Sequence, residues 1–397
     1  MLQTSKDFGL LLIVYGTAWI VMYFRNRWAR PLVENAGPSD HRSYSIDGLR
    51  GLLALGVMTH HLLVTRNFMA THRWESPPGI FVGQLGQACV AIFFMITAFL
   101  FGERLLKQRG ALNWKAFYVS RICRLTPLYL VVVALVVSST LLVQGGRLVQ
   151  PPGELLKGLG AWLLFTIPGA PDLNDVPGTF FIIAGVTWTL RYEWAFYIGL
   201  PVLAWVISRG RYWLAGALSI IGLSLFWRLA RIEPLQLLGF HAFAGGIVAA
   251  MWLTQPRWVA LARRRSFGML AVVCLCFVFF TQPSAFATHS LVALTIFFIA
   301  AAAENPVTRL LAQQTARALG EISYGVYLLH GFFLWLLRKW LPHFIDTVNI
   351  SDLRFLGWAI GMTMLVVAVT TGLHLWIERP GIIWGRRLQQ CLIKTHQ

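Results

Sequence analysis

The sequence predicts an all-α, polytopic membrane protein, and its composition is the first reason. Of the 397 residues, 57% are hydrophobic and only 13% are charged, whereas about 25% of the residues of a soluble protein are charged. Apolar runs of about 17–25 residues, long enough to cross a hydrocarbon core, recur along the whole chain. The net charge of +18 comes largely from Lys and Arg in short loops between these runs. This distribution indicates a lipid bilayer as the surroundings and argues against a nucleic-acid partner.

The apolar runs predict about eleven transmembrane helices. They are expected at residues 8–24, 47–65, 80–102, 126–144, 186–207, 213–229, 236–254, 267–281, 288–303, 320–337 and 355–377. Basic clusters then fall on one side of the membrane, at residues 25–46, 103–125, 208–212, 255–266, 304–319 and 378–397. The positive-inside rule makes that side cytoplasmic, so we expect the N-terminus outside and the C-terminus inside.

The chain divides into three parts on this basis. Residues 1–43 are expected to form an uncleaved anchor helix and a basic linker, residues 44–382 one membrane domain, and residues 383–397 a cytoplasmic tail. The apolar segment 155–167 is too short to span the bilayer, and a full span there would put the basic clusters on inconsistent sides. We therefore expect a re-entrant or interfacial helix there. The polar loop 168–185 that follows is expected to admit a substrate from outside.

The start of the second apolar run carries the most informative residues. Asp47, Arg50, His60 and His61 lie in this run, and ionisable side chains in a membrane-length apolar segment indicate a functional site. Eleven steps of about 100° separate Arg50 from His61, so both side chains share one helix face, while His60 lies about 100° away. At about 1.5 Å per residue, His61 lies about 16 Å from Arg50, near the middle of the membrane.

Two arginines precede the predicted span at 126–144. Arg121 and Arg124 are three residues apart, so they share a helix face, and they lie on the same predicted side of the membrane as Arg50. Paired arginines suit phosphate groups, which accept forked, charge-assisted hydrogen bonds. The alternative is an anchor in which both side chains reach lipid headgroups. Their position beside Arg50 favours the phosphate site.

Glu193 is the second charged residue at depth, about two turns inside the outer end of the span at 186–207. A buried carboxylate needs a partner. Arg191 on the same helix is one candidate for a structural ion pair, although residues two apart face different ways. We favour a role for Glu193 at the functional site.

A third polar group follows the spacing i, i+4, i+7. Ser323, Tyr327 and His330 form a stripe on one face of the span at 320–337. Such a stripe serves equally well as interhelical hydrogen bonding, and for His330 a structural role is as plausible as a catalytic one. His374, alone in an apolar helix, is interpreted as a packed structural residue. The five cysteines show no metal-ligand or disulfide spacing, so we expect buried thiols and no metal.

Taken in order, these segments closely resemble the membrane proteins of acyltransferase family 3, which O-acylate carbohydrates and lipids. The segments that carry the resemblance are Asp47-Gly-Leu-Arg50 with His61, Ile92 to Leu100, Arg121 to Pro127, Trp188 to Pro201, Ile322 to His330, and Ile377-Glu-Arg-Pro380. The family's ten-helix core agrees with our count once the anchor helix is subtracted. Thr97 and Ala98 depart from the family pattern, which has Ser-Gly there. Some relatives carry an additional SGNH hydrolase-like domain. Only residues 378–397 follow the last predicted span, so none is expected here.

The resemblance implies a membrane O-acyltransferase of the bacterial cytoplasmic (inner) membrane, most often an O-acetyltransferase. Its donor would be cytosolic acyl-CoA, usually acetyl-CoA, whose phosphates would meet Arg121, Arg124 and Arg50. Its acceptor would be a hydroxyl of an extracytoplasmic glycan, such as the O-antigen of lipopolysaccharide. His61 would act as general base or carry the acyl group covalently.

The remaining site residues have supporting roles in this hypothesis. Glu193 and Asp47 would orient the reacting groups, and we expect Trp188, Tyr192, Tyr327 and His330 to contact substrate. A proton-coupled transporter is the competing hypothesis, because intramembrane His, Glu and Arg also suit a proton relay. A non-catalytic scaffold would leave the buried charges unexplained.

Overall fold

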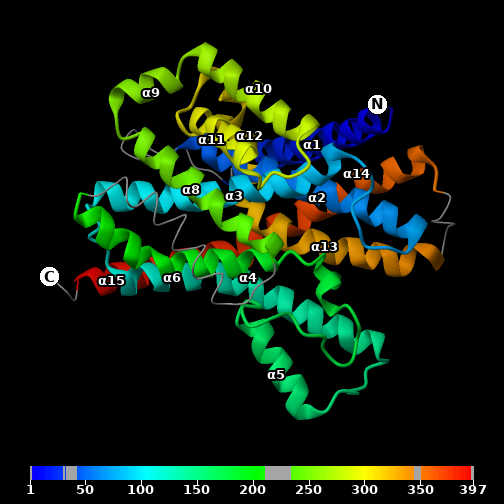
Figure 1. The fold of residues 1–397 in the computed structure, drawn as a ribbon. Coiled ribbons are helices and arrows are strands. Elements are labelled where there is room, and N and C mark those ends of the chain that lie inside the picture. Colours follow the sequence, from blue (N-terminus) through cyan, green and yellow to red (C-terminus); the bar gives the residue numbers. More distant parts are fainter. Residues whose placement is uncertain (1, 30–31, 33–42, 211–233, 344–349, 395–397) are drawn as a thin grey trace. The chain divides into compact units, whose positions relative to one another are not determined.

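A computed structural model describes residues 2–29, 32, 43–210, 234–343 and 350–394 (Figure 1). Over these residues the chain is helical and contains no strand, which confirms the all-α prediction. The first group of helices comprises α1 (Leu2–Trp28), α2 (Tyr44–Thr71), α3 (Ile80–Lys107), α4 (Trp114–Val143), α5 (Pro152–Leu163), η1 (Thr179–Ile183), α6 (Trp188–Ser208) and α8 (Pro234–Trp252). The second comprises α9 (Pro256–Ala262), α10 (Arg265–Thr281), α11 (Thr288–Ala302), η2 (Pro306–Ala312), α12 (Gln314–Glu321), α13 (Ser323–Trp340), η3 (Leu341–His343), α14 (Asp352–Leu373), η4 (His374–Glu378) and α15 (Arg379–Lys394).

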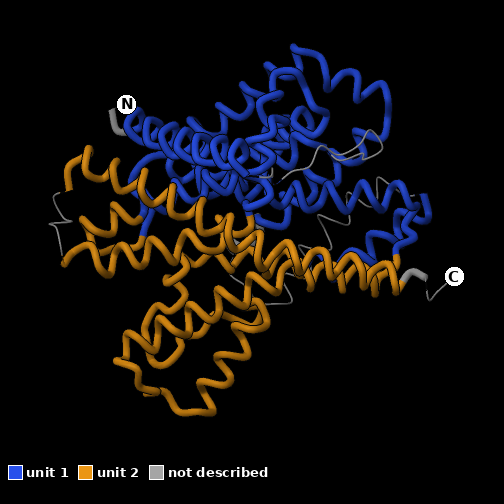
Figure 2. The backbone as a smooth tube through the Cα atoms, turned by 180° about the vertical axis from the view of Figure 1, so that it is seen from behind, with its two compact units in different colours: residues 1–64, 75–112, 195–323 blue, residues 65–74, 113–194, 324–397 orange. Residues whose placement is uncertain are grey.

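The chain forms two compact units, which Figure 2 colours separately. Unit 1 contains residues 1–64, 75–112 and 195–323, and unit 2 contains residues 65–74, 113–194 and 324–397. In unit 1, α3 packs against α8, α10 and α11. A stack of aromatic rings stabilises this packing: Phe243 lies 4.7 Å from Phe94 and 4.5 Å from Phe196 between ring centroids.

Unit 2 is built around α4, which packs along α15. Tyr129 lies in the middle of this unit with no exposed surface. Its ring stacks on Phe165 at 4.5 Å, and its hydroxyl donates a hydrogen bond to the carbonyl of Trp162 at 2.7 Å. The apolar ring is therefore buried while its one polar atom is satisfied, as a buried tyrosine requires.

Most predicted spans coincide with a helix. The span predicted at 213–229 lies outside the described residues, and the segment at 320–337 is divided between α12 and α13. Four described helices are long and apolar enough to cross a membrane, or up to six if each of two bent pairs counts as one span. The total of about eleven spans therefore stays a prediction.

Several helices continue beyond their predicted spans. The predicted tail at 383–397 is helical through Lys394, and α14, η4 and α15 follow one another without a break. Residues 255–266, predicted as a loop, contain α9. Helix α5 has 12 residues and a length of about 18 Å, which is too short to span the bilayer, as the sequence predicted.

Candidate functional site

Helix α2 holds the first group of predicted site residues. It runs without interruption from Tyr44 to Thr71, so Asp47, Arg50 and His61 lie on one helix and their predicted spacing applies. Asp47 lies in the first turn, where the positive end of the helix dipole stabilises a carboxylate. Unit 1 therefore contains a carboxylate, a guanidinium and an imidazole on one rigid element.

Glycines allow the beginning of α2 to pack directly against α12. A Cβ at Gly51 would lie 2.7 Å from the backbone nitrogen of Gly320, and a Cβ at Gly320 would overlap the carbonyl oxygen of Asp47. Gly48 likewise lies against the backbone of Leu311. The two backbones therefore approach one another more closely than any side chain would permit. Gly48 and Gly51, on either side of Leu49 and Arg50, therefore have a structural role. They fix the height and rotation of the helix that carries His61.

The two adjacent histidines of α2 have different partners. His60 Nδ1 lies 2.8 Å from the carbonyl oxygen of Val82 on α3, whereas His61 Nδ1 lies 3.1 Å from the carbonyl oxygen of Val57, one turn earlier in α2. A carbonyl oxygen only accepts hydrogen bonds, so the neutral ring carries its proton on Nδ1 in both cases. Nε2 of His61 is then the nitrogen with a lone pair, as a general base requires.

Packing against α3 explains the orientation of His60. A Cβ at Gly86 of α3 would lie 3.1 Å from the His60 ring, so this ring fills the space that the glycine leaves. The His60 and His61 rings meet edge to face, with centroids 4.9 Å apart. The prediction that His60 points away from the direction of His61 is thus consistent with the contacts in unit 1.

Unit 2 holds the paired arginines on α4. Arg121 and Arg124 are half-buried and lie inside the helix, which begins twelve residues before the span predicted at residue 126. Asn113 caps this helix by accepting a hydrogen bond from the backbone N–H of Ala116 at 3.0 Å. The arginines are therefore held on a regular helix, as predicted from their spacing.

The predicted substrate contacts lie on α6 and α13. Tyr327 is buried, and its hydroxyl lies 2.9 Å from Thr189 Oγ1 and 3.2 Å from the carbonyl of Val186. These bonds join α13 to the beginning of α6. Trp188 and Tyr192 meet edge to face at 5.4 Å one turn apart on α6. Tyr327 thus has a clear structural role, and its contact with substrate stays a prediction.

Glu193 and His330 lie on the same two helices of unit 2. Glu193 is half-buried, whereas His330 has no exposed surface. His330 Nδ1 lies 2.8 Å from the carbonyl oxygen of Val326, one turn earlier. Ser323 bonds to the carbonyl of Gly320 at 2.7 Å, so the polar stripe predicted on this face is largely satisfied by backbone carbonyls.

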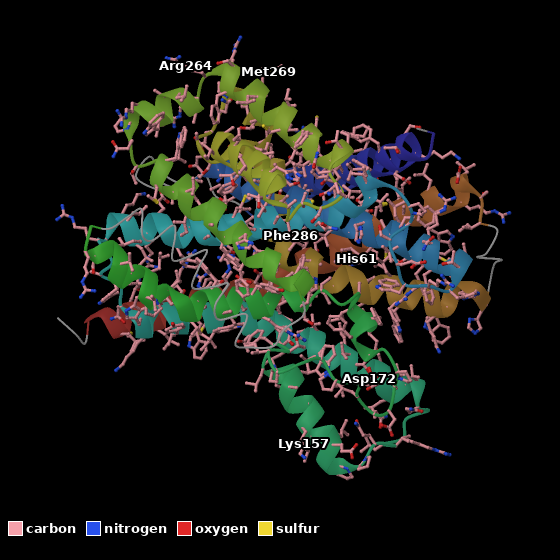
Figure 3. All side chains as sticks on the ribbon, in the orientation of Figure 1. His61, Lys157, Asp172, Arg264, Met269 and Phe286 are labelled. Atoms are coloured by element: carbon pink, nitrogen blue, oxygen red, sulfur yellow. The ribbon has the colours of Figure 1, made fainter. Side chains whose placement is uncertain are left out.

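Polar residues of the loop after α5 stabilise the conformation of that loop. Asn174 has 1% exposed surface; its side chain donates to the carbonyl of Arg147 and accepts from the backbone of Val149, both at 2.8 Å. Asp172 accepts from the backbone N–H of Thr179 at 2.9 Å. Figure 3 shows Asp172 in the loop beside α5. These hydrogen bonds stabilise the conformation of the loop, so Asn174 has a structural role.

Sequence reasoning missed one ion pair. His374 Nδ1 lies 3.0 Å from Glu378 Oε2, and both side chains are almost fully buried. The pair closes η4, a single π-helical turn between α14 and α15, and such turns frequently occur at functional sites. The expectation of a packed structural histidine agrees with this burial. The i, i+4 spacing of His and Glu was the available signal for the pair.

No group of three or more His, Cys, Asp or Glu in the described residues could hold a metal ion. The charged residues that the sequence analysis assigned to the site lie on α2, α4 and α6. These are Asp47, Arg50 and His61 in unit 1, and Arg121, Arg124 and Glu193 in unit 2.

A family model for an acyltransferase domain, Acyl_transf_3, matches residues 43–375. This match covers the helix with Arg50 and His61, the arginine helix and the helices with Glu193 and His330. The chain belongs to this acyltransferase family. The match favours the enzyme over the transporter that the sequence left open, because the family is one of acyltransferases.

Similar proteins include several O-acetyltransferases. A Staphylococcus aureus (strain COL) protein provisionally named an O-acetyltransferase is 25% identical over 324 residues, 72% of this acyltransferase and 49% of that protein. The peptidoglycan O-acetyltransferase OatA of Listeria monocytogenes is 26% identical over 322 residues, 72% of this chain and 48% of that protein. Nodulation protein 10 of Rhizobium leguminosarum bv. viciae is 25% identical over 368 residues, 82% of this chain and 94% of that protein.

The acyltransferase spans about half the length of the Staphylococcus and Listeria relatives and nearly the whole of the Rhizobium one. No solved structure matches it. Together with the apolar helices, these relatives indicate a membrane acyltransferase.

Proposed function

We propose that this acyltransferase moves an acyl group, most often acetyl, from cytosolic acyl-CoA to a hydroxyl of an extracytoplasmic glycan, with His61 as general base. Membership of the family and the O-acetyltransferase names of its relatives support the reaction class. The peptidoglycan acceptor named for the Listeria protein supports a glycan. O-antigen or another surface polysaccharide is the specific acceptor class that we propose.

The orientation of the His61 ring is the observation that carries the proposal. With its proton held on Nδ1 by the Val57 carbonyl, Nε2 can accept the proton of an acceptor hydroxyl. The hydroxyl oxygen then attacks the thioester carbonyl and the C–S bond breaks. The leaving CoA thiolate takes up the proton from His61 Nε2, which returns His61 to its neutral form. General base catalysis of this kind contributes about 10²–10⁴-fold to the rate.

The other predicted residues are assigned supporting roles in the same reaction. Arg121, Arg124 and Arg50 would bind the donor phosphates on the cytoplasmic side through charge-assisted hydrogen bonds. Glu193 and Asp47 would orient the reacting groups, and Trp188, Tyr192, Tyr327 and His330 would contact substrate. About eleven spans, an outer N-terminus and a bacterial inner membrane belong to the same proposal.

The test compares His61 with its neighbour. Wild type, His61→Ala and His60→Ala proteins, purified in detergent, are incubated with radiolabelled acetyl-CoA and a periplasmic glycan extract. We expect wild type and His60→Ala to label the glycan. The rate of transfer by His61→Ala should be lower by at least about 100-fold. Unchanged transfer by a folded His61→Ala protein would contradict the assignment. Label that stays on a protein histidine before it reaches the glycan would instead identify a covalent acyl-imidazole intermediate.

A further inference from the structure

Helices α4 and α15 of unit 2 lie side by side as an antiparallel pair (Figure 1). A Cβ at Gly381 would lie 2.7 Å from the carbonyl oxygen of Cys123 and 2.9 Å from Pro127. A Cβ at Gly385 would lie 2.7 Å from Cys123 Cβ and 3.9 Å from the Cα of Ser120. The two helices are therefore in close contact along Ser120, Cys123 and Pro127, the α4 contact face, and along Gly381 and Gly385, the α15 glycine face.

Both helices extend beyond a membrane-spanning length. The continuous helical stretch from Asp352 to Leu392 has 41 residues and α4 has 30 residues, which correspond to about 62 Å and 45 Å. A hydrocarbon core is only about 30 Å thick. Since the predicted spans leave residues 114–125 and 379–394 outside, these ends form a two-helix arm on the predicted cytoplasmic side.

The arm is strongly basic. Neither segment contains Asp or Glu, and Glu378, the nearest carboxylate before α15, is paired with His374. The basic residues of the two segments are Lys115, Arg121, Arg124, Arg379, Arg386, Arg387 and Lys394. A surface of this charge favours a ligand with several phosphate groups.

The helical geometry separates Arg386 from Arg387. At about 100° per residue, Arg124 and Arg121 lie about 70° and 130° around α4 from its contact face. Arg386 lies about 120° around α15 from its glycine face in the same rotational sense. Because the helices are antiparallel, the same sense leads to the same side of the pair. Arg387 lies about 140° in the opposite sense and so on the other side.

Arg386 also lies at the height of the α4 arginines. Gly385 contacts Ser120. Arg386 directly follows Gly385 on α15, and Arg121 directly follows Ser120 on α4. The two arginines are thus separated along the helix axes by about 3 Å. Both Arg386 and Arg387 are exposed, so they differ in direction rather than in accessibility.

We propose that Arg386 is an additional phosphate-binding residue of the donor site, acting with Arg121 and Arg124; this inference rests on the proposed function. A guanidinium binds phosphate through forked hydrogen bonds, and CoA presents a diphosphate and a separate 3′-phosphate. Three arginines on one side of the arm match this distribution of charge better than the two arginines of α4.

Lipid headgroups carry the same phosphate chemistry, but the backbone of Arg386 lies beyond the headgroup layer of the predicted membrane. It follows the end of the predicted span at residue 377 by nine residues, or about 13 Å of helix. The headgroup layer extends only about 5–8 Å beyond the hydrocarbon on each side. The position of Arg386 therefore favours a phosphate ligand from the cytosol.

The experiment measures CoA binding to the purified full-length protein in detergent by calorimetry, for wild type, Arg386→Ala and Arg387→Ala. The last variant is a matched control, because it removes the same charge from the adjacent position. We expect Arg386→Ala to raise the Kd for CoA by about tenfold or more, as for the loss of a charge-assisted hydrogen bond, and Arg387→Ala to change it less than about twofold. Equal unfolding midpoints without ligand show that both variants are folded.

Two further arms separate the outcomes. With 4′-phosphopantetheine, which lacks the adenosine phosphates, the difference between the two variants should shrink. Equal CoA affinities for the two variants, with Arg121→Ala still weakening binding, would overturn the role of Arg386 and leave the proposed function intact. Wild type that does not bind CoA would overturn the proposed function as well. If Arg386→Ala changes only retention on vesicles of anionic phospholipid, the ligand is a headgroup and the proposal is wrong.

Discussion

Two helix pairs position the proposed catalytic and donor-binding residues, α2 with α12 in unit 1 and α4 with α15 in unit 2. Both bring two backbones together through glycines. In the first pair, Gly48 and Gly51 lie within the same short motif as Asp47 and Arg50. In the second pair, Gly381 and Gly385 lie more than 250 residues after Arg121.

The two pairs differ in how far the glycines lie from the functional residues along the chain. The Asp47-Gly-Leu-Arg50 segment was singled out for its ionisable residues, and the structure adds that its glycines bring α2 close to α12. The support of Arg121 and Arg124 is contributed by a distant helix. Nothing in their own neighbourhood indicates that α15 packs against them, because that contact is purely tertiary.

The largest expected effect lies at the turn that begins α15. Glu378→Ala would leave His374 buried without its hydrogen-bond partner, which costs about 1–3 kcal/mol and more for a charged pair. We expect a large decrease in the thermal unfolding midpoint in detergent, together with weaker CoA binding, because the turn positions α15 on α4. Glu378→Gln keeps a hydrogen-bond acceptor for His374 Nδ1 and should lower the unfolding midpoint less. Equal midpoints for wild type and Glu378→Ala would show that the pair contributes nothing to stability.

The α2–α12 pair should be the next most sensitive. Gly320→Ala would place a methyl group on the carbonyl oxygen of Asp47, and overpacking of this kind typically costs about 1–3 kcal/mol or more. The overlapping atom belongs to the backbone, so we expect a loss near the upper end of this range and no rescue by a second substitution. Gly16→Ala on α1 is the matched control, because its Cβ would meet nothing within 4 Å. The unfolding midpoints of the two variants test this, and equal values would contradict the close contact.

The α4–α15 pair should respond differently to the same kind of change. Gly385→Ala meets the Cβ of Cys123 at 2.7 Å, so we expect a loss of about 1–3 kcal/mol and weaker CoA binding. Cys123→Gly removes the clashing atom and should restore part of the affinity in the double variant. Calorimetry with CoA measures both effects, and Gly372→Ala, whose Cβ would meet nothing within 4 Å, serves as control. A double variant that binds no better than Gly385→Ala would argue against this contact.

The smallest effect concerns the link between α6 and α13. Tyr327→Phe removes the hydroxyl that bonds to Thr189 and to the Val186 carbonyl, at a cost of about 1 kcal/mol. Thr189→Val should have a similar cost, and the double variant should lose less than the sum, since both residues share one bond. A rise in KM for the acceptor that the small loss of stability does not explain would identify Tyr327 as a substrate contact. Fully additive losses would show that the shared bond is not made.

Local rules were sufficient for most of the helices and for the shared helix of Arg50 and His61. They failed where a residue's role depends on a partner far along the chain. The polar loop at 168–185 is predicted to admit a substrate, but Asn174 in this loop is buried and bonded to Arg147 and Val149. Helical spacing separates His60 from His61 in the sequence, but the partners of His60 on α3, Val82 and Gly86, are known only from the structure.

By itself, the sequence predicted a helical membrane protein with arginines, a carboxylate and a histidine in apolar helices, and its motifs resembled those of acyltransferase family 3. Hydrophobic run length, charge asymmetry and helical periodicity are properties of the chain that need no tertiary contacts. Only the tertiary structure decided which partner His60 has on α3, which glycines bring α2 and α15 close to their neighbouring helices, and which side of the arm Arg386 occupies. Each of these depends on atoms that approach within a few ångströms across long sequence separations or on the rotation of one helix against another, and no local pattern encodes them.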